Sequence, residues 1–508
     1  MDAQMTDRRR LFQTLCAELG LPAEPQSLIG GAFQPGTGEG ITLEDPFTRQ
    51  TLAQYADCGA DLAARACVAA DAAQKLWVTD FNPAARGVVM QAVASALADK
   101  IETCARIEAL VAGKPLRDCR VEVTKVVEMF RYYAGWTDKL HGEVIPVPTG
   151  HLNYTIREPL GVVFQITPWN APIFTAGWQI APAIACGNGV VIKPSELTPV
   201  TTLALVHLAE GAGLPKGLVN VLTGLGPTAG EAAIAHDAVR KVVFVGSPAK
   251  GRRVAMAAGA ALKPVVLELG GKSANIVFAD ADLKPALLGA QAAIFSTAGQ
   301  SCVAGSRLLL EHSLKDRFLE MLDQGMRQIR IGDPLDEATE FGPVSNARQF
   351  AHVTAMIDGA VQDGATRLGA QVTRDDALIV PPTILTGLSP QSAAAQTEIF
   401  GPVVTALGFA DEAEAIAIAN DTVFGLAGAV WTRNGARAQR VAAAVRAGTF
   451  WINSYKAIHV SSPFGGSRSS GFGRSSGQDA LMEYTSPKSV WLDPAPIPRV
   501  AFGYAPST

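Results

Sequence analysis

The sequence has no cluster of positive charge of the kind that binds nucleic acid. Its 43 Lys and Arg residues are outnumbered by 47 Asp and Glu residues, which gives a net charge of -4, and they are scattered along the chain. Without a basic patch there is no electrostatic footprint for a polyanion, so nucleic acid is not expected as a partner. The 508 residues are 48% hydrophobic, enough for two or three cores. An intrinsically disordered chain is therefore excluded.

Cysteine is sparse and shows no pairing pattern. The odd number of cysteines and the lack of any CxxC pair argue against a disulfide framework and against a zinc site. The seven are Cys16, Cys58, Cys67, Cys104, Cys119, Cys186 and Cys302. We predict a reducing compartment, the cytoplasm, and no bound metal.

Long apolar runs are also missing. The one stretch of membrane-like length, 172–192, contains Gln179, Asn188, prolines and glycines, so a buried helix, a turn and a strand explain it better than a membrane span. At the N-terminus the basic residues 8–10 are interrupted by acidic neighbours, and the apolar run that follows is too short for a signal peptide. We expect no membrane partner.

Short β-branched runs alternate with Ala- and Leu-rich helical stretches in the middle of the chain. This rhythm is that of βαβ units, which predicts a parallel sheet with helices on its faces, as in nucleotide-binding folds. The runs lie at 162–164, 190–192, 219–222 and 242–245.

Other segments predict packing helices, a hairpin and a second α/β domain. Helical periodicity covers 61–78, where Asp61 is placed to cap the helix, and 83–110. Alternation around Thr149 and Gly150 predicts an exposed hairpin over 142–157. After about residue 270 we expect strands at 276–278, 307–311 and 403–409, a helix at 314–329, and a last strand at 489–492 before a Pro-rich tail.

Cys302 is the one cysteine that lies in a Gly- and Ser-rich turn, FSTAGQSCVAGSR. Small neighbours leave its backbone amide accessible, which suits a nucleophile. The alternative for any single cysteine is a buried, inert small hydrophobe, and the residue taken alone favours that alternative.

Glu268 and Asn170 follow apolar runs at the expected ends of strands. Burial there would raise the pKa of the Glu268 carboxyl toward that of a general base, and the Asn170 amide could donate to an oxyanion. The alternatives are a solvated glutamate and a turn asparagine, and position alone does not decide between them.

Two glycine segments are candidates for phosphate binding. One runs from Gly224 through Gly226 to Gly230, and the other from Gly246 to Gly251 after a clear strand. Neither is a full GxGxxG. Because arginines at 252 and 253 stand where a P-loop needs Lys and Ser or Thr, an ATPase is not supported.

Taken together, these motifs resemble the aldehyde dehydrogenase superfamily, in matching order. The resemblance spans about 28–491 and closes with SPFGGSRSSGFGR at Ser462. It is carried by PWN at Pro168, KPSE at Lys193, VGS at Val245, ELGGK at Glu268, GQSC at Gly299 and EIFGP at Glu398.

The resemblance implies an α/β fold of three parts. These are a Rossmann-like NAD-binding domain (1–139 and 159–269), an α/β catalytic domain (270–470) and a small β oligomerisation domain (140–158 and 471–508). It also implies self-association as a homodimer or homotetramer.

The same resemblance implies that a Cys302 thiolate attacks an aldehyde. Asn170 and the Cys302 amide would hold the oxyanion, and Glu268 would activate the water that hydrolyses the thioester. Relatives that transfer the acyl group to coenzyme A lack this glutamate. A coenzyme A acylating enzyme and a non-catalytic binding protein on the same fold remain the alternatives.

The implied cofactor is NAD rather than NADP, because a carboxylate at Glu196 accepts from a 2'-hydroxyl but repels a 2'-phosphate. The residues implied for the cofactor are Ile166, Thr167, Trp169, Lys193, Glu196, Gly226, Gly246, Ser247, Glu398 and Phe400.

Two departures from the family pattern bear on catalysis and on substrate. Gln179 and Gln478 stand where we expect the family's proton-relaying lysine and glutamate, which predicts a neutral pair. The first two tunnel positions are small, which predicts a bulky or aromatic aldehyde. The tunnel positions are Ala171, Thr175, Trp178, Ser301, Val303, Ile458 and Phe464.

Overall fold

The β-branched runs of the first half form one mixed sheet whose central strands are parallel. The structure is a computed structural model, and it describes residues 7–369 and 375–494. In sheet order the strands are β19 (Gly471–Phe472), β11 (Val265–Glu268), β10 (Val239–Val245), β7 (Val162–Ile166), β8 (Gly189–Lys193), β9 (Val219–Val221), β1 (Ser27–Ile29) and β2 (Ala32–Gln34). All four predicted strands of this region are therefore confirmed.

Helices cover both faces of this eight-stranded sheet. Val163 points to a core shared with one set of helices, and its neighbours Val162 and Phe164 point to the opposite core, as the two-residue period of a strand requires. One face carries α3 (Pro83–Ala98), α4 (Ile101–Ala112), α5 (Leu116–Ala134), α6 (Pro172–Ala185) and α7 (Val200–Gly211); the other carries α2 (Gly59–Thr79), α8 (Glu231–Ala235) and α9 (Pro248–Ala260).

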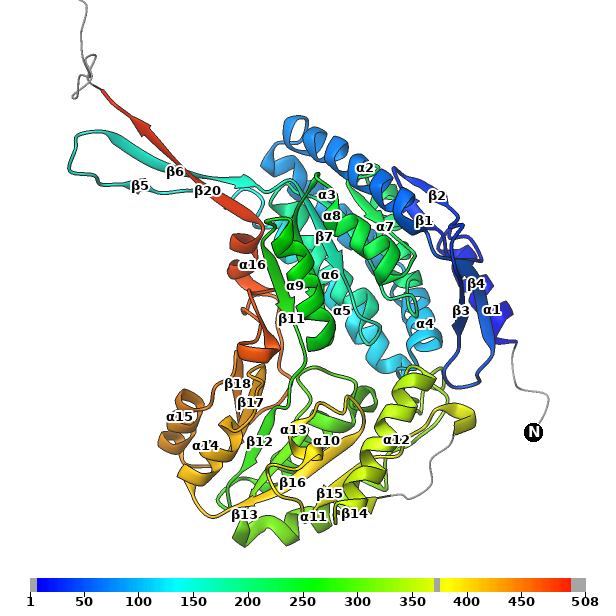
Figure 1. Cartoon of the computed structure of the whole chain (residues 1–508), viewed down its shortest axis with the longest axis vertical. Coiled ribbons are helices and arrows are strands. Elements are labelled where there is room, and N and C mark those ends of the chain that lie inside the picture. The colour runs from blue at the N-terminus through cyan, green and yellow to red at the C-terminus, as the bar shows by residue number, and fades with distance from the viewer. Residues whose placement is uncertain (1–6, 370–374, 495–508) are drawn as a thin grey trace, which may run out of the picture.

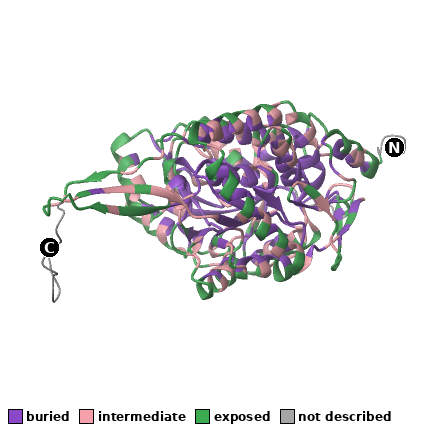
Figure 2. Ribbon diagram, turned by 90° about the horizontal axis from the view of Figure 1, so that it is seen from above, coloured by how far each residue is buried: buried purple, intermediate pink, exposed green. Residues whose placement is uncertain are grey.

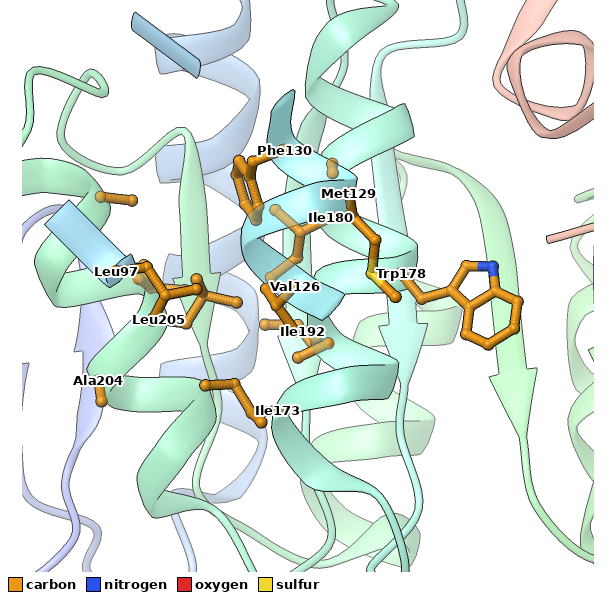
Figure 3. Packing of buried hydrophobic residues seen from close by; sticks show 14 of the residues in the cluster. Leu97, Val126, Met129, Phe130, Ile173, Trp178, Ile180, Ile192, Ala204 and Leu205 are labelled. Carbon is orange, nitrogen blue, oxygen red and sulfur yellow. The ribbon is translucent and has the colours of Figure 1, made fainter. Parts of the chain in front are cut away.

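The first of these cores combines aliphatic and aromatic side chains. Residues of α3, α5, α6, α7 and β8 meet there, and Trp178 of α6 extends away from the rest of the group (Figure 3). The stretch 172–192 is the predicted helix, turn and strand. No helix in the described ranges is long and apolar enough to cross a membrane.

Two details of the helix predictions were wrong. Asp61 lies in the first turn of α2 and does not cap it, because the helix already begins at Gly59 after Cys58. The stretch 83–110 is two helices, since the chain leaves helical geometry at Lys100; Asn82 caps the first of them by accepting from the Ala85 amide at 2.9 Å.

The second half forms a seven-stranded sheet with its own core (Figure 1). Its strands, in sheet order, are β14 (Thr366–Gly369), β15 (Thr383–Thr386), β16 (Val403–Phe409), β13 (Arg307–Glu311), β12 (Ala274–Val277), β17 (Ala427–Trp431) and β18 (Thr449–Ile452). The helices around it are α10 (Leu283–Phe295), α11 (His312–Met326), α12 (Ala347–Gln362), α13 (Ala393–Gln396), α14 (Glu412–Asn420) and α15 (Gly435–Ala444).

A narrow arm projects from the first lobe (Figure 1). It pairs β5 (Val144–Ile145), β6 (Leu152–Pro159) and β20 (Thr485–Leu492) in a three-stranded antiparallel sheet, so the predicted hairpin and last strand are confirmed. Figure 2 shows that most of the arm is exposed or half-buried. The tail beyond Pro494 lies outside the described residues.

Most of the remaining elements belong to the first lobe, whereas η2 and η3 lie in the second. Residues 471–484, which the domain division assigns to the oligomerisation segment, return to the eight-stranded sheet as β19 and to α6 as α16 (Gly477–Glu483). The others are α1 (Arg8–Glu18), β3 (Gly40–Glu44), β4 (Thr51–Ala56), one π-helical turn, η1 (Gly226–Gly230), and the short helices η2 (Ser296–Gly299), η3 (Asp375–Ala377) and η4 (Arg468–Ser470).

Candidate active site

Cys302 lies on a loop that enters from the second lobe and is bent by three successive left-handed residues, Thr297, Ala298 and Gly299. A side chain at Gly299 would meet the carbonyl oxygen of Gly401 at 2.0 Å. The GQSC and EIFGP motifs are therefore packed backbone to backbone, and only glycine fits at this contact.

Glu268 and Asn170 meet this loop from the first lobe. Glu268 ends β11, and Asn170 follows β7, whose last residue pairs with Lys193 at the end of β8. The carboxyl ends of these parallel strands thus lie at one edge of the sheet, as predicted. The Asn170 side-chain amide donates to the Gln300 carbonyl at 2.9 Å, two residues before Cys302. That bond uses one of the two amide hydrogens, and the other remains available to an oxyanion.

Electrostatics at the site follow from burial. Desolvation raises the pKa of the Cys302 thiol to about 12, with Glu398 and Glu268 adding to the rise and the Val303 amide and Lys456 opposing it. Desolvation also raises the pKa of Glu268 to about 8, although the Ser475 hydroxyl donates to its Oε1 at 2.7 Å and lowers it. A carboxyl with this pKa exchanges protons near neutral pH, as a general base must.

Glu398 lies against the double glycine of ELGGK. The Gly271 amide donates to its Oε1 at 3.0 Å, and a side chain at Gly270 would meet its Oε2 at 2.0 Å. Burial raises the pKa of Glu398 to about 7. The backbone carbonyl oxygen of Cys302 is 2.6 Å from where a Gly271 side chain would begin. The two glycines leave room here for the nucleophile's loop and for a ligand beside Glu398.

The strand ends and one helix N-terminus form a cradle that fits a dinucleotide. Gly246 and Ser247 precede α9, and Ser247 makes no side-chain cap bond, so the first amides of the helix are open to a diphosphate. Lys193 is buried, and its ammonium donates hydrogen bonds to the carbonyl oxygens of Pro194 and Gly224, at 3.0 and 2.9 Å. Glu196 is only half-buried, so its carboxylate can accept from a ribose hydroxyl.

Other residues assigned to the cofactor lie at the same edge. Trp169 and Phe400 meet edge to face with ring centroids 5.4 Å apart, although they belong to different lobes. Thr167 follows β7, and its buried hydroxyl has no partner among the described residues. Ile166 ends β7. Gly226 begins η1, and a side chain added at Gly226 would meet no atom within 4 Å.

Three of the tunnel positions, Trp178, Val303 and Phe464, belong to one apolar cluster, and Cys302 and Ile458 each pack against that cluster. Trp178 contacts Phe464 with centroids 5.1 Å apart, and it contacts Phe174, which the sequence prediction missed, at 4.7 Å. Thr175 is buried, whereas Ala171 and Ser301 are half-buried. One wall of the site is therefore aromatic.

The prediction of a Gln179 and Gln478 pair was wrong. Gln478 is exposed in the first turn of α16, whereas Gln179 donates to the Ser475 hydroxyl at 3.3 Å and accepts from the Tyr484 hydroxyl at 2.7 Å. Because Ser475 also bonds Glu268, a chain of neutral side chains runs from the carboxylate to Tyr484. The absence of charged side chains at this position was predicted, but Ser475, the residue that bonds Gln179 there, was not. Ser475, directly after the closing GR, was the signal.

Comparison with known proteins agrees with this arrangement. The model of the aldehyde dehydrogenase family matches residues 33–490. The chain belongs to the aldehyde dehydrogenase family. Betaine aldehyde dehydrogenase of Bacillus subtilis (strain 168) is 39% identical over 463 residues, 90% of this chain and 94% of that one. Human retinal dehydrogenase 2 is 39% identical over 461 residues, 90% and 87% of the two chains.

A solved structure is equally similar. PnpE from Pseudomonas sp. WBC-3, in complex with nicotinamide adenine dinucleotide, matches with a TM-score of 0.91 and 42% identity over 93% of this chain and 99% of PnpE. The predicted family, fold class and NAD cofactor are thus confirmed, and the protein is an NAD-dependent aldehyde dehydrogenase.

Proposed function

We propose that the protein oxidises an aldehyde to the free carboxylic acid with NAD as cofactor. The observation that carries the proposal is the convergence of Cys302, Glu268 and Asn170 from three distant segments at one sheet edge. The cofactor assignment is supported by the cradle at Lys193 and the N-terminus of α9, and by the NAD complex of PnpE.

In the proposed reaction, the Cys302 thiol loses its proton to solvent water and its sulfur forms a bond to the aldehyde carbon. The carbonyl oxygen becomes an oxyanion that accepts hydrogen bonds from the Asn170 amide and the Cys302 backbone amide. Bound NAD supplies the acceptor for the hydride that leaves this carbon, and collapse of the oxyanion gives a thioester. Glu268 then takes a proton from the attacking water, the C–S bond breaks as that proton passes from Glu268 to the departing sulfur, and the acid and the Cys302 thiol are released.

The substrate proposed is a bulky, ring-containing aldehyde. Ala171 and Thr175 are small, and the rings of Phe174, Trp178 and Phe464 form a wall on which a planar group can stack. The names of the relatives include betaine aldehyde and retinal dehydrogenases, which act on aldehydes larger than acetaldehyde.

The test is NADH production by the purified protein with acetaldehyde, benzaldehyde and larger aldehydes, with NAD and NADP in parallel. We expect turnover with NAD alone, and a higher kcat/KM for benzaldehyde than for acetaldehyde. If turnover required coenzyme A, the thioester would be resolved by acyl transfer to coenzyme A and not by hydrolysis, and the proposal of a free acid product would be wrong. A higher kcat/KM for acetaldehyde than for benzaldehyde would contradict the proposed substrate class.

We also propose that the arm mediates self-association. Its strands expose Val144 and Trp491 by 72% and 55%, which leaves apolar surface open on the arm although the Trp491 ring meets the His151 ring edge to face. Replacing Val144 and Trp491 with aspartate should shift the sedimentation coefficient to that of a monomer. An unchanged coefficient would place the interface elsewhere.

A further inference from the structure

Lys456 is placed beside the nucleophile by two neighbouring hydrogen bonds. Its ammonium donates to the Ser296 hydroxyl at 2.6 Å, at the start of the turn that leads to Cys302. The adjacent Tyr455 hydroxyl donates at 3.0 Å to the carbonyl of Val303, the residue after Cys302. Lys456 also has a left-handed backbone (φ 58°), a costly conformation for lysine that persists only where the surroundings fix it.

The positive charge of Lys456 has no ion-pair partner within the described ranges. Asp118 and Glu122 on α5 attract it electrostatically, but Asp118 is paired with Arg117 at 3.4 Å and Glu122 is paired with Lys114. Lys456 is only half-buried, yet desolvation lowers the pKa of its ammonium to about 8, the Cys302 thiolate and the two carboxylates opposing this. A desolvated ammonium held by one neutral hydroxyl leaves room for an anion.

The surroundings of Lys456 belong to the substrate side of the site. Ile458, two residues later, packs against the same apolar cluster as Cys302, the cluster that holds Trp178 and Phe464, and Lys456 itself interacts electrostatically with Cys302. The cofactor residues Glu398 and Phe400 come instead from the segment after α13, near Gly270. An anion that reaches Lys456 past these apolar side chains would therefore enter as part of the substrate.

We propose that Lys456 binds a carboxylate carried by the aldehyde substrate, so that the preferred substrates are aldehyde acids. The proposal rests on the proposed function and narrows its substrate class. The aromatic wall alone would also accept a quaternary ammonium group through cation–π contacts. Lys456 repels such a cation, which separates this site from one built for betaine aldehyde.

The experiment compares matched substrates that differ only in charge. The first set is 4-carboxybenzaldehyde, its methyl ester and 4-(trimethylammonio)benzaldehyde; the second is succinic semialdehyde and its methyl ester, so that substrate length does not decide the result. We expect the intact enzyme to prefer each carboxylate over its ester by about tenfold or more in kcat/KM, and to use the trimethylammonio compound least.

Substitutions of Lys456 test whether this residue is the source of the preference for the carboxylate over its ester. In Lys456→Met the carboxylate-to-ester ratio should fall to about one, in Lys456→Arg it should be largely kept, and in Lys284→Met, an exposed lysine on α10, it should equal that of the parent. An equal loss for acid and ester in Lys456→Met, with a shifted pH profile of Cys302 alkylation, would assign Lys456 to the thiol instead. A ratio unchanged by the substitution would overturn the proposal.

A measurement without turnover separates the two proposals. Terephthalate should protect Cys302 from iodoacetamide better than its monomethyl ester does, and Lys456→Met should abolish that difference. Protection of this kind in a protein that oxidises no aldehyde would contradict the proposed function while supporting the carboxylate site. Equal protection by the two compounds would contradict the site, whatever the activity.

Discussion

The proposed cofactor side and the proposed substrate side of Cys302 are built from different kinds of chemical group. On the cofactor side, glycines and strand ends place main-chain groups and carboxylates, as at Gly270, Gly271 and Glu398. On the substrate side, bulky side chains from α6 and from the segment after β18 form the surface. A cofactor that is the same in every turnover can be bound by main-chain groups, whereas a particular substrate is selected by the side chains that contact it.

The largest effect is expected from Cys302→Ser. A serine hydroxyl is a weak nucleophile here, so NADH production should fall on the order of 1,000-fold or more. NAD affinity, measured by calorimetry, should stay close to that of the parent if the two sides are independent. Loss of both would show that the nucleophile's loop also holds the cofactor. Full retained activity would overturn the mechanism.

Glu268→Gln should separate the two halves of the reaction. Without a base the thioester is not hydrolysed, and steady-state turnover should fall roughly 100- to 10,000-fold. Rapid mixing should show a burst of about one NADH per active site, because acylation precedes the step that needs Glu268. Absence of a burst, with acylation equally slowed, would assign Glu268 to thiol activation.

Gly270→Ala tests the cofactor side alone. The added methyl group would begin 2.0 Å from the Glu398 carboxylate and must displace it. We expect the KM for NAD to rise about tenfold, the cost of one hydrogen bond to a charged group, with the KM for aldehyde unchanged. Gly259→Ala, on α9 with open space around it, is the matched control. A rise in both KM values would mean that the two sides share this contact.

Ser475→Ala should have the smallest effect. Ser475 donates to Glu268 and lowers its pKa, so removing the hydroxyl should raise that pKa above its value of about 8. Glu268 acts as a base only when ionised, so the rising limb of the pH–rate profile should move to higher pH, and turnover near pH 7 should fall roughly two- to tenfold. Ser476→Ala is the control, because it removes a hydroxyl that bonds the Ser462 carbonyl and not Glu268. It should leave the pH of the rising limb unchanged.

Prediction succeeded where a residue's place follows from its own segment. Strands such as β13 and β16 match their predicted bounds because each is a continuous apolar run, and Cys302 was singled out by its small neighbours. It failed where a contact joins segments far apart in sequence. Gln179 meets Ser475 rather than Gln478, because the start of α16 turns Gln478 to solvent.

The sequence by itself determined the family, the α/β class and the three catalytic candidates, because motifs rich in glycine record local backbone geometry. Only the tertiary structure decided which groups surround them. The neutral chain behind Glu268, the aromatic contact of Phe174 with Trp178, and the hydrogen bond of the Lys456 ammonium to Ser296 all depend on side chains brought together by packing. Burial then sets the pKa values of Cys302 and Glu268, since desolvation is a property of the folded surroundings and not of the residue.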